Sequence, residues 1–394
     1  MAAIETIKLS AQCLCNAHTF TTTVPLASLP LEASCCHCDS CRHTTGALYT
    51  CDAAWPGSFD DIRASSLSKY EFSPSLTILS CGTCSTPMFY HKRIADQEDT
   101  IGVFTGALTN APAPNLLKIV DHIFIGDTID GGASVWMRHL NKDGSSPRLW
   151  KAGRNNSEEL HDIWPPVKDL PSAESKTGLD EIPFLCHCRG VNLVLRRGDL
   201  DFAGMQHDRL PWFVDPTSHK PLAGFDACNS CRTFFGSDIV NWSYSQLIHL
   251  DFPTSQTQPE GEGFPRTSFD LKTAVCSDDR DSRFGTLAIY ESSPDVQRYF
   301  CSRCSASVFY AVDDRPEMVD VAVGLLESPS GARAEDFLVW GFGSEIGSKT
   351  DTMGGWRETF VSDIQKEAEA WRISRDYPKS WKRIAKEEAD AASS

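Results

Sequence analysis

The fold is decided by the segment YEFSPSLTILSCGTCSTPMFY at residues 70–90, because a near copy, YESSPDVQRYFCSRCSASVFY, stands at residues 290–310. The two segments align without a gap at an offset of 220 residues, and both cysteines, a Ser-Pro pair and a final Phe-Tyr coincide. Similarity at a fixed offset indicates a repeated structural unit. The sequence therefore predicts two copies of one fold in a single chain.

The cysteines extend this repeat over most of the chain. Each copy has a C-x-C pair followed by two C-x-x-C pairs, namely Cys13/Cys15, Cys38/Cys41 and Cys81/Cys84, then Cys186/Cys188, Cys228/Cys231 and Cys301/Cys304. The offset grows from 173 to 190 to 220 residues along these pairs, so the second copy carries inserted segments. The insertions are rich in Pro, Gly, Ser and Thr, which predicts surface loops.

Short apolar, β-branched or alternating stretches predict a mainly β fold with one sheet-rich domain per copy. The expected strands are 19–25, 76–80, 119–125, 191–196, 286–290 and 319–323. We expect a first domain at 1–150, a linker at 151–182, a second domain at 183–350 and a helical tail at 351–394, interrupted at Pro378. The basic stretch from Arg372 to Lys386 favours a solvated amphipathic helix over an anionic docking site.

Composition excludes several classes of protein. With 37 basic and 53 acidic residues the net charge is −16, which argues against nucleic acid or an anionic membrane as a partner. Glu5 and Lys8 stand where a signal peptide needs an apolar stretch, and no apolar run is long enough to be a membrane span. We therefore expect a cytoplasmic protein, in which 16 cysteines indicate metal ligands more than disulfides.

Two clusters have the composition of closed structural zinc sites, because two close pairs from distant chain positions supply four tetrahedral ligands. The predicted ligands are Cys13, Cys15, Cys81 and Cys84 in the first copy, and Cys186, Cys188, Cys301 and Cys304 in the second. The alternative is a redox C-x-x-C motif or disulfides.

A third cluster has only three cysteines on one tight turn, Cys36, Cys38 and Cys41, followed by Arg42. Three thiolates fill three corners of a tetrahedron and leave one open, as in a catalytic zinc site. Arg42 could offset the negative charge and hold an anionic substrate, alone or with Lys92 and Arg93. The alternative is a fourth protein ligand that closes the site, with Cys35, His37 or His43 as candidates.

The second copy departs from this pattern, because Asp226 precedes Cys228 and Cys231 where a cysteine would be expected. Two thiolates and a carboxylate make a harder zinc site, so the cluster could hold a metal or be empty. Cys276 is a candidate for the missing thiolate. The total expected is three or four zinc ions per chain.

These motifs resemble the glutathione-dependent formaldehyde-activating family, which includes centromere-protein-V-like members. The resemblance rests on C-x-C, CHCxxCR with Gly46-Ala47, the later C-x-x-C, Asp121-His122-Ile123 and Trp136, and it recurs in the second copy. It implies two tandem, tent-like Mss4-like β domains and a carbon-sulfur lyase. It also implies structural zinc at the four-cysteine cluster and catalytic zinc at Cys36, Cys38 and Cys41.

Three functional hypotheses follow from these observations. The first is a zinc-dependent carbon-sulfur lyase that acts on a small thiol or thiol adduct, with glutathione as co-substrate and an aldehyde as the simplest pair. The second is a zinc Lewis-acid lyase or isomerase that acts on a larger metabolite without glutathione. The third is a non-catalytic zinc scaffold. Candidate proton donors are His37, His43, His91 and His122. The sequence predicts neither the general acid nor the oligomeric state.

Overall fold

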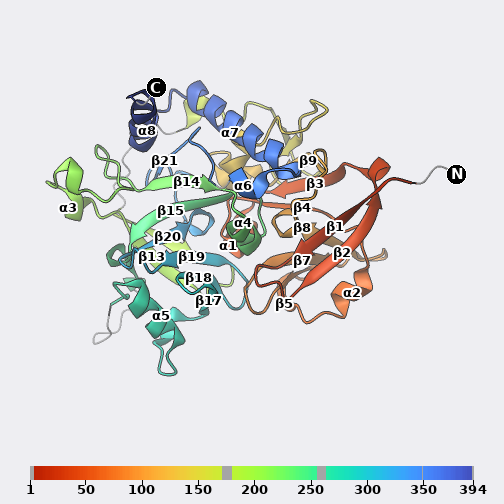
Figure 1. Cartoon of the computed structure of the whole chain (residues 1–394), viewed down its shortest axis with the longest axis horizontal. Helices are drawn as coiled ribbons and strands as arrows, with labels where there is room; N and C mark the ends of the chain where they lie inside the picture. The colour runs from red at the N-terminus through yellow and green to blue at the C-terminus, as the bar shows by residue number, and fades with distance from the viewer. Residues whose placement is uncertain (1–3, 171–179, 255–262, 348, 393–394) are drawn as a thin grey trace.

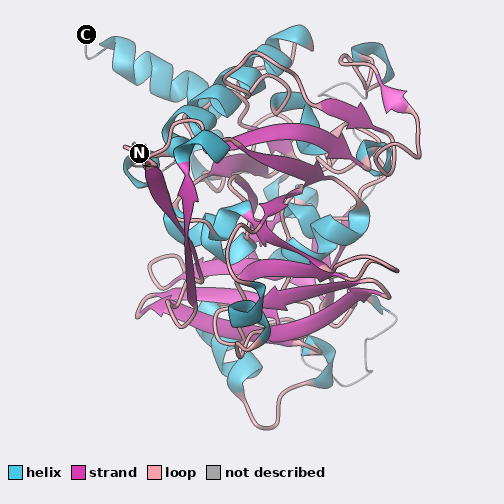
Figure 2. Cartoon of the chain, turned by 90° about the vertical axis from the view of Figure 1, so that its right-hand side faces the viewer, coloured by secondary structure: helices cyan, strands magenta, loops and turns pink. Residues whose placement is uncertain are grey.

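The computed structural model describes residues 4–170, 180–254, 263–347 and 349–392 of the chain. In Figure 1 the first repeat, coloured red to yellow, lies on the right and the second, green to blue, on the left. The short helices α1 (Asp39–Thr45) and α4 (Asn229–Phe235) lie between them. Figure 2 shows that most strands lie in two broad layers, with helices above, between and below them.

The first repeat is built on a nine-stranded sheet of order β11-β10-β9-β3-β4-β8-β7-β6-β5. The strands, in chain order, are β3 (Leu31–Cys36), β4 (Thr50–Ala54), β5 (Ser68–Ser73), β6 (Leu76–Ser80), β7 (Pro87–Lys92), β8 (Thr100–Phe104), β9 (Leu117–Ile123), β10 (Arg148–Trp150) and β11 (Glu159–Leu160). Helix α2 (Phe59–Arg63) connects β4 to β5. Strands β3 and β9 are parallel, which places Cys35 and Cys36 beside His122 and Ile123.

The second repeat has a seven-stranded sheet of order β17-β18-β19-β20-β15-β14-β21. Its strands are β14 (Leu222–Asp226), β15 (Val240–Gln246), β17 (Leu287–Ser293), β18 (Val296–Cys301), β19 (Ser307–Val312), β20 (Met318–Ala322) and β21 (Val339–Trp340). This order matches β5-β6-β7-β8-β4-β3-β9 strand for strand. The duplication inferred from the cysteines is therefore also a duplication of topology.

A small ribbon precedes each large sheet and carries the C-x-C pair in its turn. The first is β1 (Thr6–Gln12) with β2 (Thr19–Pro25), and the second is β12 (Glu181–Leu185) with β13 (Asn192–Arg196) and β16 (Leu250–Asp251). Inserted segments of the second repeat add α3 (Asp199–Phe202) and α5 (Ser268–Cys276). All six predicted strands are present, with ends shifted by at most three residues.

The repeats contact each other reciprocally. Helix α1 packs against the 3₁₀ helix η10 (Val323–Leu325), and α4 packs against the equivalent η2 (Thr105–Ala107). The Gly324 amide donates to the Gly46 carbonyl at 2.9 Å, and the Gly106 amide donates to the Gly236 carbonyl at 3.2 Å. These matching contacts give the chain the form of a fused dimer with an approximate two-fold axis.

One cluster of buried apolar side chains runs through both repeats and includes Tyr49, Phe235, Leu325 and Trp371. Burial of apolar surface is the main favourable term in folding, so the two halves share much of their stabilisation. A second, smaller cluster lies within the first repeat.

The expected linker is partly structured, because β11 lies inside residues 151–182 and extends the first sheet. Residues 171–179 of that segment lie outside the described residues. The second repeat also continues past residue 350. Asp351-Thr352-Met353 with Gly354-Gly355 follows β21 as Asp127-Thr128-Ile129 with Gly131-Gly132 follows β9.

The C-terminal segment forms α6 (Lys349–Thr352), α7 (Trp356–Ser374) and α8 (Trp381–Ala392), with the predicted interruption at Pro378. Helix α7 contacts both repeats, since Arg357 pairs with Asp238 of the second repeat at 2.9 Å and donates to the Thr105 carbonyl of the first repeat at 2.6 Å. The basic residues between 372 and 386 contact the protein itself, through the pairs Arg372–Glu369, Arg375–Glu335, Lys379–Glu387, Arg383–Glu369 and Lys386–Glu345, and through Lys382 over Trp212. This favours the amphipathic-helix interpretation.

No helix in the described ranges is long and apolar enough to cross a membrane.

Candidate metal centres

The first four-cysteine cluster joins the β1–β2 ribbon to the turn between β6 and β7. The sulfur atoms of Cys13, Cys15, Cys81 and Cys84 lie within 4.8 Å of one another. The Cys13–Cys15 and Cys15–Cys81 sulfur distances are 3.6 and 3.5 Å. With Zn–S bonds of about 2.3 Å, the edge of a tetrahedron is about 3.8 Å, so the thiols are spaced to hold zinc.

The second four-cysteine cluster repeats this arrangement with Cys186, Cys188, Cys301 and Cys304, whose sulfurs also lie within 4.8 Å. The amide of the residue five positions after the first cysteine donates to its sulfur in both copies, at 3.2 Å from His18 to Cys13 and 3.3 Å from Val191 to Cys186. All sixteen cysteines are free thiols. The structure thus brings together every residue predicted for the closed sites, and the donors fit zinc.

The three-cysteine cluster is formed where β3 ends and α1 begins. Cys38 is the N-cap of α1, and its sulfur accepts from the Cys41 amide at 3.3 Å and lies 3.5 Å from the Cys36 sulfur. All three sulfurs lie within 4.8 Å of one another. Gly46 ends the helix with a φ of 84°, a left-handed conformation that glycine adopts without strain.

Within the described residues, no fourth Cys, His, Asp or Glu ligand atom joins this cluster. Cys35 instead faces Cys51 across β3 and β4, in register with it. His37 Nε2 lies 2.8 Å from His122 Nδ1. The cluster therefore offers three protein ligands and an open position.

In the second repeat the equivalent cluster is Asp226, Cys228 and Cys231, whose ligand atoms also lie within 4.8 Å. Asp226 accepts from the Cys228 amide at 2.7 Å. Cys276 does not join this cluster, because it is exposed at the end of α5. The structure therefore does not place Cys276 as the replacement thiolate.

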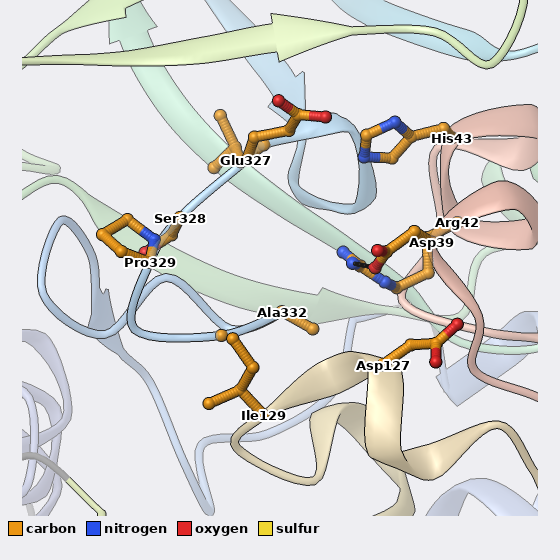
Figure 3. A pocket seen from close by; sticks show the side chains of 11 residues that line it. Asp39, Arg42, His43, Asp127, Ile129, Glu327, Ser328, Pro329 and Ala332 are labelled. Atoms are coloured by element: carbon orange, nitrogen blue, oxygen red, sulfur yellow. Dashed lines mark hydrogen bonds and ion pairs between the residues drawn. The ribbon is translucent and has the colours of Figure 1, made fainter. Parts of the chain in front are cut away.

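A cavity of roughly 310 Å³ lies beside α1, between the two repeats. Figure 3 shows Asp39, Arg42 and His43 on one side, Asp127 and Ile129 below, and the chain of the second repeat opposite. The second repeat contributes residues 326–329, 331 and 332. A site that sequence analysis assigned to the first repeat is thus walled by both.

Residues 8–127 match the family model described as glutathione-dependent formaldehyde-activating enzyme, abbreviated GFA. The first repeat is a GFA domain. The match spans its four-cysteine and three-cysteine clusters and ends at Asp127. The second repeat is tied to it by topology and cysteine order, outside the matched residues. No curated protein and no solved structure matches the chain.

Electrostatics in the GFA domain favour cation binding at the open cluster. Hydrogen bonding from the Cys36 and Cys41 thiols lowers the pKa of Cys38 to about 3, and the Cys41 amide and Arg42 act in the same direction. A sulfur that accepts hydrogen bonds from its neighbours is stabilised as a thiolate, which is the form that binds a metal. Arg42 is buried, with only 6% of its side chain exposed, and pairs with Asp39.

The basic patch expected around Arg42 is not formed. Arg93 pairs with Glu71 and lines a different cavity of the GFA domain, with His91. His91 itself is bonded to Asp99 at 2.7 Å. Arg93 and His91 lie at the end of β7 that is remote from the three-cysteine cluster. The structure therefore does not support His91 as a proton donor.

The other three candidate proton donors are buried near the cluster and neutral. Burial lowers the pKa of His43 to about 3 and of His122 to about 4, and lowers that of His37 as well. His122 Nε2 lies 3.2 Å from the Met137 carbonyl oxygen. Because a carbonyl oxygen can only accept a hydrogen bond, Nε2 is the ring nitrogen that carries the hydrogen and donates it. Of the three, His43 alone lines the cavity.

Sequence analysis missed Asp127 and the wall at residues 326–332. Asp127 lies next to Asp39 and Cys38, whose negative charges add to burial in raising its pKa. Its counterpart Asp351 accepts from the Asn229 amide at 2.7 Å, at the start of α4. The repeated Asp-Thr with Gly-Gly was a signal in the sequence that could have identified both residues.

Proposed function

We propose that the GFA domain is a zinc-dependent carbon-sulfur lyase that joins a thiol to an aldehyde or separates the adduct, with glutathione and formaldehyde as the simplest pair. The observation that carries this proposal is a three-thiol cluster with an open fourth position beside a cavity. Zinc, when bound there, would make a thiol at the open position nucleophilic at neutral pH.

The chain's own residues would supply the metal ligands and would orient the substrate. Cys36, Cys38 and Cys41 hold the metal, Arg42 binds acceptor atoms of the substrate, and neutral His43 borders the cavity. In the forward direction a sulfur–carbon bond forms, the carbonyl π bond opens, and the oxygen takes up the proton that left the thiol. No group leaves, so the reaction is an addition.

The four-cysteine clusters would be structural zinc sites that hold each ribbon to its sheet. In this proposal they add two ions to the one at the open cluster. We also infer that the protein acts in a reducing compartment such as the cytosol, because its ligand thiols must stay reduced.

The test compares three single variants of the zinc-loaded protein. Cys38→Ala should abolish formation of the glutathione–formaldehyde adduct, followed by NMR, and leave the melting temperature within a few degrees of wild type. Cys228→Ala, the same change in the second cluster, is the matched control and should keep activity. Cys81→Ala, which removes a ligand of the first four-cysteine cluster, should unfold the protein. Full activity in Cys38→Ala would refute the proposal.

The second candidate, Lewis-acid chemistry without glutathione, is favoured by the three carboxylates of the cavity, Asp39, Asp127 and Glu327, which oppose an anionic ligand. A thermal shift separates the two candidates. Millimolar glutathione should raise the melting temperature if it binds the native protein. No shift would favour the second candidate.

A further inference from the structure

The cavity contains an arginine whose hydrogen bonds are incomplete. Nε and Nη1 of Arg42 are buried and have no partner, while Nη2 bonds to Asp39. Figure 3 shows the Arg42 side chain pointing into the cavity from α1. A buried, unsatisfied guanidinium is costly, so oxygen atoms from a ligand would stabilise it.

The second repeat shows what this arginine binds when it is satisfied. Arg232 stands at the same position of α4, and its Nη1 donates to the carbonyls of Gly106 and Leu108 at 2.6 and 2.8 Å. Its Nε and Nη2 donate to Asn229 Oδ1 at 3.0 and 2.7 Å. In the first repeat Asp39 takes the place of Asn229 but bonds only to Nη2 of Arg42, and Nε and Nη1 make no corresponding hydrogen bonds. These two donors are open to the two oxygens of a carboxylate.

Across the cavity the second repeat contributes Glu327, which follows η10. Its side chain is exposed and has no ion-pair partner among the described residues, and it points toward His43 in Figure 3. Asp39 and Asp127 lie on the Arg42 side of the cavity, so Glu327 supplies the negative charge of the opposite wall. This end of the cavity favours a cation.

We propose that the cavity between the repeats binds the amino-acid end of a thiol or thiol adduct, with its carboxylate on Arg42 and its ammonium on Glu327 of the second repeat. This rests on the proposed function for the thiol itself. It makes the second repeat the part of the molecule that selects the substrate.

The first test is a series of thiols titrated into zinc-loaded protein by calorimetry without oxygen. Cysteine and glutathione carry both charges, cysteamine only the ammonium, and 3-mercaptopropionate only the carboxylate. We expect at least one of the two zwitterions to bind about tenfold tighter than either single-charge thiol. Cysteine and glutathione place the two charges at different distances from sulfur. The thiol that binds more tightly therefore identifies which of the two the cavity accepts. Equal affinity across the series would overturn the proposal.

The second test uses Glu327→Gln. The control is Glu181→Gln, because Glu181 is an exposed residue of β12. Glu327→Gln should weaken cysteamine and the tighter zwitterion about threefold and leave 3-mercaptopropionate unchanged. Arg42→Lys should weaken only carboxylate-bearing thiols, about tenfold. Equal weakening of all thiols by Glu327→Gln would contradict a specific contact. Charge selectivity without turnover on any aldehyde would refute the proposed function and leave this inference intact.

An independent observation concerns the second cluster. Arg298 of β18 is 2% exposed, and its Nη1 lies 3.6 Å from Cys231 Sγ while its Nη2 donates to Ser230 at 3.0 Å. In the first repeat Ile78 stands at the same place, since Ile78 pairs with Tyr70 and Tyr90 as Arg298 pairs with Tyr290 and Tyr310.

We infer that the second cluster binds no zinc, because the Arg298 guanidinium takes the place of the metal's positive charge. A dication on Cys231 would lie within a few ångströms of a buried cation, and like charges at that distance in a protein interior repel strongly. Asp226, the third donor, already accepts from the Cys228 amide. The chain would then hold three zinc ions, all at all-cysteine clusters.

Metal analysis of matched variants tests this inference. The zinc content should be three in wild type, two in Cys38→Ala and three in Cys228→Ala. The double variant Asp226→Cys with Arg298→Ile, which copies the first repeat, should gain a fourth ion, whereas Asp226→Cys alone should not. A loss of zinc in Cys228→Ala, or no gain in the double variant, would overturn the inference. A content of two zinc ions per chain in both wild type and Cys38→Ala would refute the proposed function but not this inference.

Discussion

His37 and His122 form a buried hydrogen-bonded pair directly behind the open cluster. Because His122 Nε2 donates to the Met137 carbonyl, its Nδ1 is the acceptor for His37 Nε2. This chain of bonds fixes the tautomer and orientation of the imidazole between Cys36 and Cys38. We assign the pair a positioning role, because neither histidine lines the cavity.

The pKa of His122 is lowered to about 4 by burial, from an ordinary value of 6.5. Between these values the unfolded chain binds a proton that the folded chain does not, so stability should fall as the pH drops from about 6.5 toward 4. The imidazole signals of His122 in NMR spectra should stay in the neutral form down to about pH 5. A protonation midpoint at or above pH 6 would contradict the buried pair.

At the residue scale the sequence predicts the cysteine clusters well, because cysteine spacing within a turn is local and is repeated at a second place in the chain. It predicts Arg42 as a substrate contact but not its missing hydrogen bonds, since these depend on which loop of the other repeat lies opposite. The Arg298–Ile78 difference is visible in the aligned segments, yet only the strand register shows that Arg298 reaches Cys231.

Among the elements, η10 and η2 are the contacts that hold the repeats together. A Cβ atom added at Gly324 of η10 would lie 2.2 Å from the Ala47 carbonyl oxygen, which is backbone and cannot move aside alone. Gly324→Ala should therefore destabilise the protein by about 2 kcal/mol or more in urea unfolding. Gly347→Ala is the control, because a Cβ there meets nothing within 4 Å. Equal urea midpoints for the two variants would show that moving the repeats apart at Gly324 does not destabilise the protein.

Helix α7 depends on a fully buried ion pair between Arg357 and Asp238 at 2.9 Å. Arg357→Met would leave the Asp238 carboxylate without its charged partner, which costs about 3–5 kcal/mol for a buried pair. We expect a marked fall in the urea midpoint and earlier proteolysis of α7. Lys366→Met, on the exposed face of the same helix, should change the midpoint little. An unchanged midpoint in Arg357→Met would mean that α7 is anchored elsewhere.

The strands were predictable because each is a short apolar or alternating run between turn residues. The elements at the ends of the repeats were not predictable. Strand β11 has only two residues, and α6 stands where the first repeat has an irregular 3₁₀ turn. The helical tail is predicted by periodicity, but its docking on the repeats depends on two charges 119 residues apart, Arg357 and Asp238.

For the molecule as a whole, the shared core predicts that the repeats unfold together. If the four-cysteine clusters hold zinc as proposed, a strong chelator at neutral pH should lower the melting temperature of the entire chain in one transition, because both ribbons would lose their metal. Calorimetry and circular dichroism should give the same midpoint, and added zinc should restore it. Two separate transitions would show that the halves are independent domains.

The two-fold arrangement of the repeats also bears on how such a protein can change over time. In a dimer of identical chains every substitution appears in both subunits, so one centre cannot be altered without the other. Fusion into one chain removes that restriction. An arginine can enter one half while isoleucine stays in the other, and a loop can be shaped to serve its neighbour's reaction. The asymmetry between Arg298 and Ile78 is of a kind that only a heteromer or a fused chain can inherit.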